Sequence, residues 1–246
     1  EDLTLQENDG RHAVKHVSLT VHAGEILGIA GVQGNGQTEL VEAITGLRPY
    51  ASGSIQLNGL EMPPENPRTL TENGMAHIPE DRHKHGLVLP YPLTDNLILC
   101  SYYKPPFVDG LVRNDEAINS FAEERIEAFD IRTPSAFIPA ANLSGGNQQK
   151  LIVARELSRD VKILIANQPT RGLDVGSIEY IHRTLITMRD RGVGILLVSA
   201  ELDEILSLAD RIAVMYEGEI VATLAAADAT REELGLLMAG SKKEHA

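Results

Sequence analysis

The sequence predicts an α/β fold in which helices cover both faces of a mostly parallel sheet. One observation is a set of short, nearly apolar runs with the length of buried strands, at residues 25–30, 162–166, 193–198 and 211–216. A second is the alternation of the later runs with helical patterns, at residues 176–190 and 201–208. The third is a glycine-rich loop that follows the first run and precedes a helix expected over 37–46.

The other strands and the last helix follow from local patterns. Further strands are expected from alternation or apolar content, at residues 14–21, 54–57, 75–78 and 219–224. The last of these follows a hairpin turn at Glu217-Gly218. A final helix is expected at about 230–239.

Between about 88 and 158 the pattern is helical, which predicts a helical insert in the α/β domain. Within 115–129 the apolar residues recur at near-helical spacing, and Thr94-Asp95-Asn96 offer a cap for a helix start. Prolines break the stretch into pieces, at Pro105, Pro106, Pro134 and Pro139.

Length and composition describe one large domain, or one domain with a subdomain. The 246 residues are 43% hydrophobic, enough for a sizeable core, and no apolar run approaches the roughly 20 residues of a membrane-spanning helix. A net charge of −13 argues against binding nucleic acid or anionic lipid directly. The chain opens at Glu1-Asp2 without an initiator Met or a signal peptide, so we expect a fragment of a longer protein.

The only cysteine, Cys100, excludes an internal disulfide and fits a reducing compartment. No pattern of His and Asn partners accompanies it, so a core or interface cysteine explains it better than a catalytic nucleophile.

The glycine-rich loop has the spacing and context of a phosphate-binding loop, Gly31-Val32-Gln33-Gly34-Asn35-Gly36-Gln37-Thr38. Its glycines let backbone N–H groups converge on an anion at a helix N-terminus, and Thr38 can reach a magnesium ion. Gln37 stands where such loops have lysine. Losing a charged hydrogen bond of roughly 1.5–3 kcal/mol weakens phosphate binding without abolishing it. Taken alone, the loop also fits an ordinary strand-to-helix turn.

The segment Ala166-Asn167-Gln168-Pro169-Thr170-Arg171-Gly172-Leu173-Asp174 follows an apolar run. This layout of a buried strand, two polar residues and a turn is typical of the metal-and-base segment of an ATPase. Chemistry at such a place uses two carboxylates, one for the metal and one to activate water. Asn167 and Gln168 are amides, which can orient water but cannot take its proton near pH 7.

The run Leu143-Ser144-Gly145-Gly146-Asn147-Gln148 is a complete L-S-G-G-x-Q sequence. The Ser144 hydroxyl, the N–H groups of Gly145 and Gly146 and a helix start expected near 147 are again suited to an anion. This run is identified as the signature of ABC ATPases, and it lies 23 residues before Asn167. The whole chain resembles one ABC nucleotide-binding domain. The resemblance implies a P-loop NTPase fold of the ABC type over 1–246, with an antiparallel β subdomain and a helical subdomain at about 88–158.

Three segments narrow the resemblance to the second of two fused domains in importers of simple sugars and nucleosides: 28–40, 78–86 and 168–176. The variant Q-P-T-R-G-L-D, with Gln168, is similar to the guanosine-type nucleoside branch rather than the ribose branch.

The resemblance also implies a role for each matching residue. Those expected at ATP are Gly31, Gly34, Asn35, Gly36, Gln37, Thr38 and, at the position of the nucleotide-sensing glutamine, Glu80. Asn167 replaces the magnesium carboxylate, Gln168 the catalytic glutamate and Ala200 the histidine that contacts the γ-phosphate. The turn Gly172-Leu173-Asp174 is intact. An adenine-stacking aromatic is missing before Tyr50, and His12 is a poor substitute.

In this family, the two nucleotide sites of a dimer are composite, and each signature serves the site across the interface. We therefore expect this domain to lend Ser144, Gly145 and Gly146 to a competent site on the other domain of the same polypeptide. Its own site would bind ATP and Mg²⁺ weakly and hydrolyse poorly, with Thr38 as the remaining metal contact. The expected location is the cytoplasmic face of the inner membrane, against permease subunits and indirectly an external substrate-binding protein. Candidate permease contacts are Glu80, Tyr102-Tyr103 and 105–108.

Two other functions stay open. A DNA-repair or chromosome-organising ATPase also has this signature, but such proteins insert very long coiled coils, and only about 105 residues without sustained heptads separate Thr38 from Ser144. A regulatory nucleotide-binding module without a transport role is the other alternative. Among smaller signals, His83 and His85 are better explained as solvated residues than as metal ligands. The acidic cluster Glu201, Asp203 and Glu204 fits an ordinary helix N-terminus.

Overall fold

The computed structural model describes residues 1–6 and 12–240. The chain forms two compact units. The first unit contains residues 1–77, 162–168 and 184–246, and the second contains residues 78–161 and 169–183.

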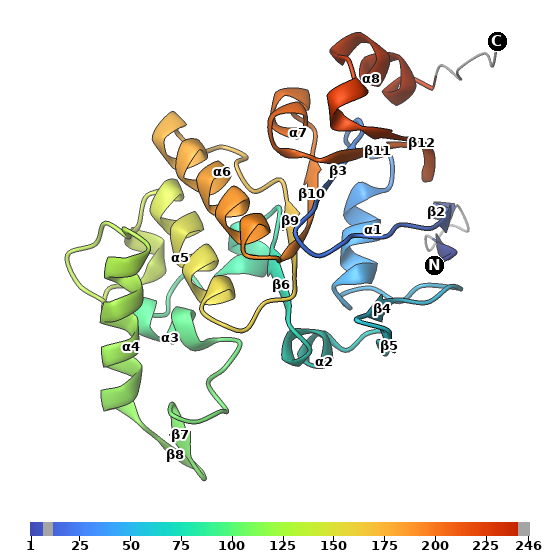
Figure 1. The fold of residues 1–246 in the computed structure, drawn as a ribbon. Coiled ribbons are helices and arrows are strands. Elements are labelled where there is room, and N and C mark those ends of the chain that lie inside the picture. The colour runs from blue at the N-terminus through green and yellow to red at the C-terminus, as the bar shows by residue number, and fades with distance from the viewer. Residues whose placement is uncertain (7–11, 241–246) are drawn as a thin grey trace, which may run out of the picture. The chain divides into compact units, whose positions relative to one another are not determined.

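The first unit is built on a six-stranded sheet with the order β12-β11-β3-β10-β9-β6 (Figure 1). Its strands are β3 (Ile26–Ala30), β6 (Met75–Ile78), β9 (Ile163–Asn167), β10 (Gly194–Ser199), β11 (Arg211–Tyr216) and β12 (Glu219–Ala225). The central strands β11, β3, β10 and β9 run parallel, and β12 is antiparallel to β11. The parallel strands confirm the α/β prediction, because parallel neighbours need crossover connections such as helices. The antiparallel pairing of β11 with β12 confirms the hairpin at Glu217-Gly218.

Helices cover both faces of this sheet. On one face, Leu27 and Ile29 of β3 share a buried cluster with Leu40 and Val41 of α1 (Gln37–Ile44). On the other, Gly28 approaches Ile205 of α7 (Leu202–Leu208), whose Cγ2 lies 3.1 Å from the place of a Cβ on the glycine. Neighbouring residues of a strand point to opposite faces, so α1 and α7 lie on opposite sides. α8 (Arg231–Met238) packs on β11.

Short antiparallel pieces complete the first unit and fulfil the expectation of a β subdomain. β1 (Leu3–Gln6) pairs with β2 (His12–Val17), and β4 (Gln56–Leu57) pairs with β5 (Leu60–Glu61). The strand predicted at 14–21 therefore ends early, and that predicted at 54–57 has only two residues. β1 and α2 (Pro67–Glu72), which Asn66 caps, have no strong apolar period and were not predicted.

The second unit is mainly helical, as predicted. It contains the π-helix Arg82–Gly86, α3 (Leu93–Ile98), α4 (Asp115–Ala128), α5 (Gly145–Leu157) and the start of α6 (Val175–Asp190). Short 3-10 turns occur at Ala140–Asn142 in this unit and at Ala226–Asp228 in the first. A small hairpin, β7 (Val108–Asp109) with β8 (Val112–Arg113), interrupts the helical stretch and was not predicted.

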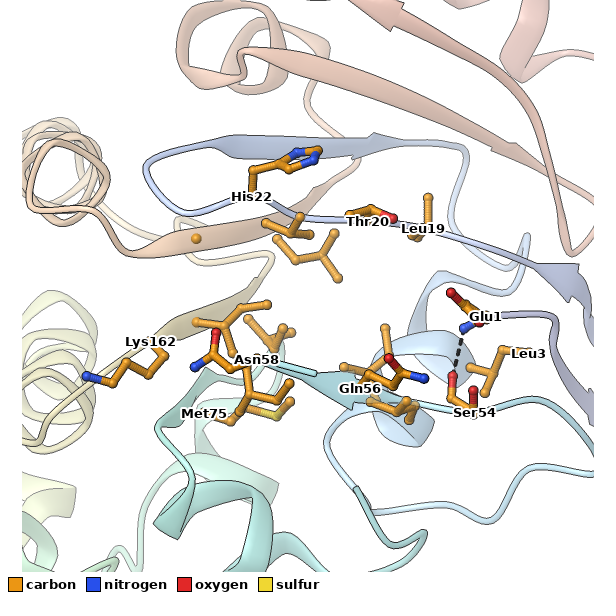
Figure 2. A pocket seen from close by; sticks show the side chains of 18 of the residues that line it. Glu1, Leu3, Leu19, Thr20, His22, Ser54, Gln56, Asn58, Met75 and Lys162 are labelled. Atoms are coloured by element: carbon orange, nitrogen blue, oxygen red, sulfur yellow. Dashed lines mark hydrogen bonds between the residues drawn. The ribbon is translucent and has the colours of Figure 1, made fainter. Parts of the chain in front are cut away.

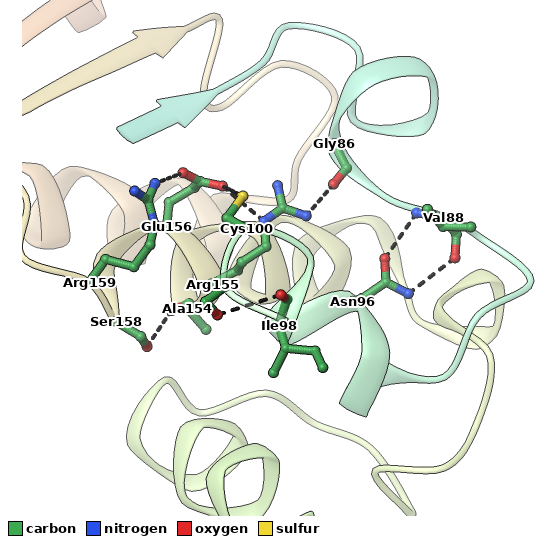
Figure 3. A network of polar contacts seen from close by, with 11 residues as sticks. Gly86, Val88, Asn96, Ile98, Cys100, Ala154, Arg155, Glu156, Ser158 and Arg159 are labelled. Atoms are coloured by element: carbon green, nitrogen blue, oxygen red, sulfur yellow. Dashed lines mark hydrogen bonds and ion pairs between the residues drawn. The ribbon is translucent and has the colours of Figure 1, made fainter. Parts of the chain in front are cut away.

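The cap predicted at Thr94-Asp95-Asn96 is wrong. α3 begins at Leu93, so these residues lie within the helix, and no side chain caps it. The buried Asn96 amide instead accepts from the backbone N–H of Val88 at 2.9 Å and donates to the Val88 carbonyl at 3.1 Å (Figure 3). The hydrogen bonds of the Asn96 side chain therefore hold the preceding loop rather than the helix end.

Within residues 1–6 and 12–240, no helix is both long enough and apolar enough to cross a membrane.

Candidate functional site

The glycine-rich loop lies between β3 and α1, where an anion-binding loop belongs. Gly34 and Gly36 have φ values of 92° and 104°, which glycine adopts without strain. A Cβ on Gly36 would also lie well inside 3.0 Å of the Ala13 carbonyl oxygen. Gly36 is the N-cap of α1 and has no side chain to cap it, so the N-cap position leaves the N–H groups of the first turn open to an anion. The loop therefore retains the backbone geometry for phosphate.

Gln37 is folded into this loop. Its side chain is buried, and Nε2 donates to the Val32 carbonyl at 3.1 Å. A Cβ on Gly31 would lie well inside 3.0 Å of the same Nε2 atom, so the glycine makes room for the Gln37 side chain. The sequence indicated only the loss of a charge at this position. The structure adds an internal bond that supports the loop while bringing no charge to a phosphate.

Asn167 and Ala200 are two more of the own-side residues, meaning those expected at this domain's own nucleotide site. The strands place both at the same end of the sheet. Asn167 ends β9 in register with Val198, and Ser199 of β10 is in register with Ala30 of β3, just before the loop. Asn167 is buried, whereas Ala200 directly after β10 is exposed. The carboxyl ends of parallel strands therefore place the loop, Asn167 and Ala200 at the same edge of the sheet.

Gln168 has an unusual backbone. Its φ is 49°, in the left-handed region that non-glycine residues seldom adopt, and its N–H donates to the Val198 carbonyl at 2.8 Å. Such strain persists where the surroundings enforce it and is common at functional sites. The side chain of Gln168 ends in an amide, and that of Ala200 is only a methyl group. This end of the sheet therefore offers backbone N–H donors but no general base at Asn167, Gln168 or Ala200.

A cavity of about 310 Å³ in the first unit is separate from the loop (Figure 2). Its walls are largely apolar and include Leu40 and Ile44 of α1, while Lys162 and His22 are among the polar residues that line it. It contains none of the residues predicted to bind ATP.

The signature forms the start of α5 in the second unit. The helix begins at Gly145 rather than near 147, because Ser144 caps it: its Oγ accepts from the backbone N–H of Asn147 at 3.4 Å and from Asn147 Nδ2 at 3.0 Å. Asn147 Oδ1 in turn accepts from the Arg132 N–H at 2.8 Å. Ser144 is exposed, and as an acceptor in both bonds it keeps its hydroxyl proton for donation to an anion.

The other signature residues are packed. Leu143 and Gln148 are buried, and Gln148 Nε2 donates to the Ala140 carbonyl at 3.1 Å. A Cβ on Gly146 would collide with Ser177 Oγ and would lie 3.1 Å from Asp174 Oδ2. Glycine is therefore required here by a neighbour as well as by backbone N–H access.

The Gly172-Leu173-Asp174 turn lies beside the signature within the second unit. Gly172 has a φ of 70°, and Asp174 accepts from the Ser177 hydroxyl at 2.7 Å and the Ser177 N–H at 3.0 Å. These two bonds, the hydroxyl bond first, lower the pKa of Asp174. Asp174 is thus a carboxylate that caps the start of α6.

Glu80 is engaged by a residue that the sequence did not single out. It forms an ion pair with Arg171, whose backbone carbonyl also accepts from Arg82 Nη1 at 3.3 Å. Arg82, Arg171 and Ser177 are neighbours of the candidate site to which no sequence pattern assigned a role. The two glycines at 145 and 146 were the available signal, since each leaves room for one of these side chains.

The smaller candidates behave as ordinary residues. His83 Nε2 and Gln148 Oε1 are 2.9 Å apart, and no group of three metal-binding side chains occurs within the described ranges. Cys100 Sγ donates to Glu156 Oε1 at 3.5 Å (Figure 3), and burial, then the charge of Glu156, raise the pKa of the thiol to about 11. A thiol held protonated is a poor nucleophile.

A family model described as "ABC transporter" matches residues 14–171 of the chain. The guanosine import ATP-binding protein of Bacillus subtilis is 51% identical over 246 residues, which are 100% of this chain and 48% of that protein. The nucleoside import ATP-binding protein of Lactococcus lactis is 50% identical over 98% of this chain and 47% of its own length. A ribose import ATP-binding protein of Lacticaseibacillus paracasei is 38% identical over 94% of the chain and 46% of its own length. The chain thus spans about half the length of the curated relatives it matches.

Solved structures agree on the fold. An ATP-binding subunit of an ABC transporter aligns with a TM-score of 0.79 at 22% identity, covering 97% of this chain and 98% of that chain. A dimeric ATP-binding cassette bound to ADP and phosphate aligns with a TM-score of 0.77 at 20% identity, covering 92% and 97%.

Proposed function

The chain belongs to the ABC transporter family of ATP-binding domains, and we propose that it is one such domain of an importer for nucleosides or simple sugars. The names of the relatives at 51% and 50% identity favour a nucleoside over a sugar. The transported solute is chosen by other subunits in such systems, so this chain would contribute to the ATP-driven step rather than to solute specificity.

We propose further that this domain is the non-catalytic half of a pair fused in one polypeptide. The supporting observation is that the signature is intact whereas four groups of the domain's own site are lost. Ser144 is exposed with its hydroxyl proton available, and Gly145 and Gly146 begin α5. By contrast, Gln37, Asn167, Gln168 and Ala200 offer no lysine, carboxylate or imidazole. The signature would stabilise the γ-phosphate held by the phosphate loop of the other domain.

Its own site would bind ATP with Mg²⁺ weakly and turn it over poorly. Backbone N–H groups of the loop and the start of α1 still suit a phosphate, and Thr38 is the second residue of that helix, next to Gln37. The charge that lysine would add is absent, because Gln37 is neutral and donates to Val32. No carboxylate stands at Asn167 or Gln168 to complete a magnesium site.

The partners would be the other ATP-binding domain, membrane permease subunits on the cytoplasmic face and, indirectly, an external substrate-binding protein. No nucleic acid is needed. The permease contact we propose lies on the second unit, where a cavity of about 340 Å³ has an apolar lining that includes Tyr102 and Phe107. Leu111, at the tip of the β7–β8 hairpin, is fully exposed beside it. The Arg113–Asp95 ion pair of 2.5 Å provides a polar rim that suits a short amphipathic helix.

The test is transport-coupled ATPase activity of the full-length protein with its permease. Ser144→Arg fills the anion site and should lower turnover by at least about a hundredfold, the usual loss for one oxyanion-type donor. Ser120→Arg, the same change at an exposed position of α4, is the matched control and should remain near wild type. Turnover of Ser144→Arg equal to that of the control would disprove the signature-donating role.

A further inference from the structure

We propose that Arg82 is a positioning residue that holds the signature loop in the geometry needed to meet the partner's nucleotide. This inference rests on the proposed function, because it assigns a further residue to the composite site that the signature would complete. All the contacts involved lie within the second unit.

The guanidinium of Arg82 lies between two functional segments. Its Nη1 donates to the carbonyl of Arg171 at 3.3 Å, and its Nη2 lies 3.0 Å from the place that a Cβ on Gly145 would take. The residue thus packs against the first residue of α5 while it donates a hydrogen bond to the turn before Gly172. A planar guanidinium can reach both neighbours at once, whereas the single ammonium of a lysine cannot.

Arg82 also begins a π-helix that follows one face of α5. Contacts between this helix and α5 recur three or four residues apart, at Gly145, Gln148, Ile152 and Arg155. Gly86 allows the close approach, because a Cβ there would lie 2.5 Å from Ile152 Cδ1. Its carbonyl accepts from Arg155 Nη1 at 2.6 Å (Figure 3).

The start of the π-helix is itself secured. Asp81 accepts from the N–H groups of Lys84 at 3.0 Å and His83 at 2.9 Å, which lower its pKa. π-helices are rare and frequently occur at functional sites. Arg82 therefore projects from a fixed backbone rather than from a mobile loop.

A second contact is made at the next residue of the signature. Asp174 and Ser177 pack against Gly146, while Glu80 holds the side chain of Arg171 whose carbonyl Arg82 binds. Gly145 and Gly146 thus each contact a different neighbour, Arg82 at Gly145 and the Asp174–Ser177 pair at Gly146. Removing Arg82 releases the contact at Gly145 without changing the donor groups of the loop.

The first test measures hydrogen–deuterium exchange by mass spectrometry in the full-length protein. Arg82→Met loses both the hydrogen bond to the Arg171 carbonyl and the close contact at Gly145. It should therefore raise exchange by about fivefold in peptides covering 144–148 and in those covering 171–174, the factor that corresponds to one net hydrogen bond. Lys84→Met is the matched control: it removes the same charge from the same π-helix, at an exposed position. Arg82→Lys should lie between the two, and it serves for the same measurement if Arg82→Met does not fold. Equal exchange in the Arg82 and Lys84 variants overturns the proposal.

The second test measures transport-coupled ATPase activity of the same proteins. Arg82→Met should lower kcat by about fivefold or more and leave the KM for ATP within about twofold, as expected when an interaction matters mainly in the closed transition state. A change in melting temperature with unaltered kcat would reduce Arg82 to a structural residue and overturn the proposal. If exchange rises but Ser144→Arg also leaves turnover unchanged, the proposed function fails while the positioning of the loop by Arg82 stands.

Discussion

The hydroxyl of Ser177 occupies the space that a Cβ on Gly146 would need. These residues are 31 apart in the chain (177 − 146), and their contact joins the signature to the turn at Gly172-Leu173-Asp174 within one unit. Ser177 is at the same time a double donor to Asp174. The shape of the signature therefore depends on a residue outside its own motif.

Gly146→Ala should consequently destabilise the second unit by about 1–3 kcal/mol, the usual cost of overpacking, and lower coupled ATPase activity. Ser177→Ala removes the colliding oxygen, so the double variant should recover part of the lost melting temperature. Gly176→Ala is the control, because its Cβ would meet only Asp174 Oδ1 at 3.4 Å, an ordinary contact. Calorimetry of the wild type, the two single variants, the double variant and the control checks this, and additive losses in the double variant would contradict it.

Gln37→Lys should strengthen ATP binding at the domain's own loop by about ten- to a hundredfold, since it restores a charged hydrogen bond of roughly 1.5–3 kcal/mol. Fluorescent-nucleotide titration of full-length protein whose other phosphate loop has been disabled isolates this site. Gln33→Lys adds the same charge to an exposed position of the same loop and should gain far less. Equal gains in both variants would show that net charge, and not the position of residue 37, governs affinity.

Restoring all four own-side groups should raise the rate of ATP hydrolysis at this domain's own site, where we expect little. Gln37→Lys, Asn167→Asp, Gln168→Glu and Ala200→His together supply the charge, metal ligand, base and imidazole. A correctly placed general base contributes about 10²–10⁴-fold. Single-turnover hydrolysis in protein with the other site disabled measures the gain. Substantial hydrolysis before any substitution would contradict the assignment of a silent site.

The Cys100 thiol should react slowly with iodoacetamide below about pH 10, because its pKa is raised to about 11 by burial and by Glu156. Glu156→Gln removes the carboxylate charge and should move the pH profile of alkylation downward. For stability the sign is that of a raised pKa: the contribution is complete below the ordinary value near 9 and is lost as pH rises through about 11. Mass spectrometry of alkylation against pH checks the profile. An unshifted profile in the variant would remove Glu156 as a cause.

Much of the α/β core could be predicted because its strands are buried on both faces. β3, β10 and β11 appear within one residue of the predicted runs, since their apolar content reflects their environment directly. β2, the cap of α3 and the β7–β8 hairpin were placed poorly or missed, because their signals are short and tertiary contacts decide them. Asn96 shows this, because its side chain bonds to the Val88 backbone eight residues away.

The residue types alone established the chemistry: amides at 37, 167 and 168, a methyl group at 200, and a complete signature from Leu143 to Gln148. What can accept a proton, hold a charge or bind a phosphate follows from the side chain itself. Only the tertiary structure decided that Gln37 folds back onto Val32, that Glu80 pairs with Arg171 and that Arg82 lies against Gly145. The physical reason is that these contacts arise from how loops and helices pack, which no local periodicity encodes.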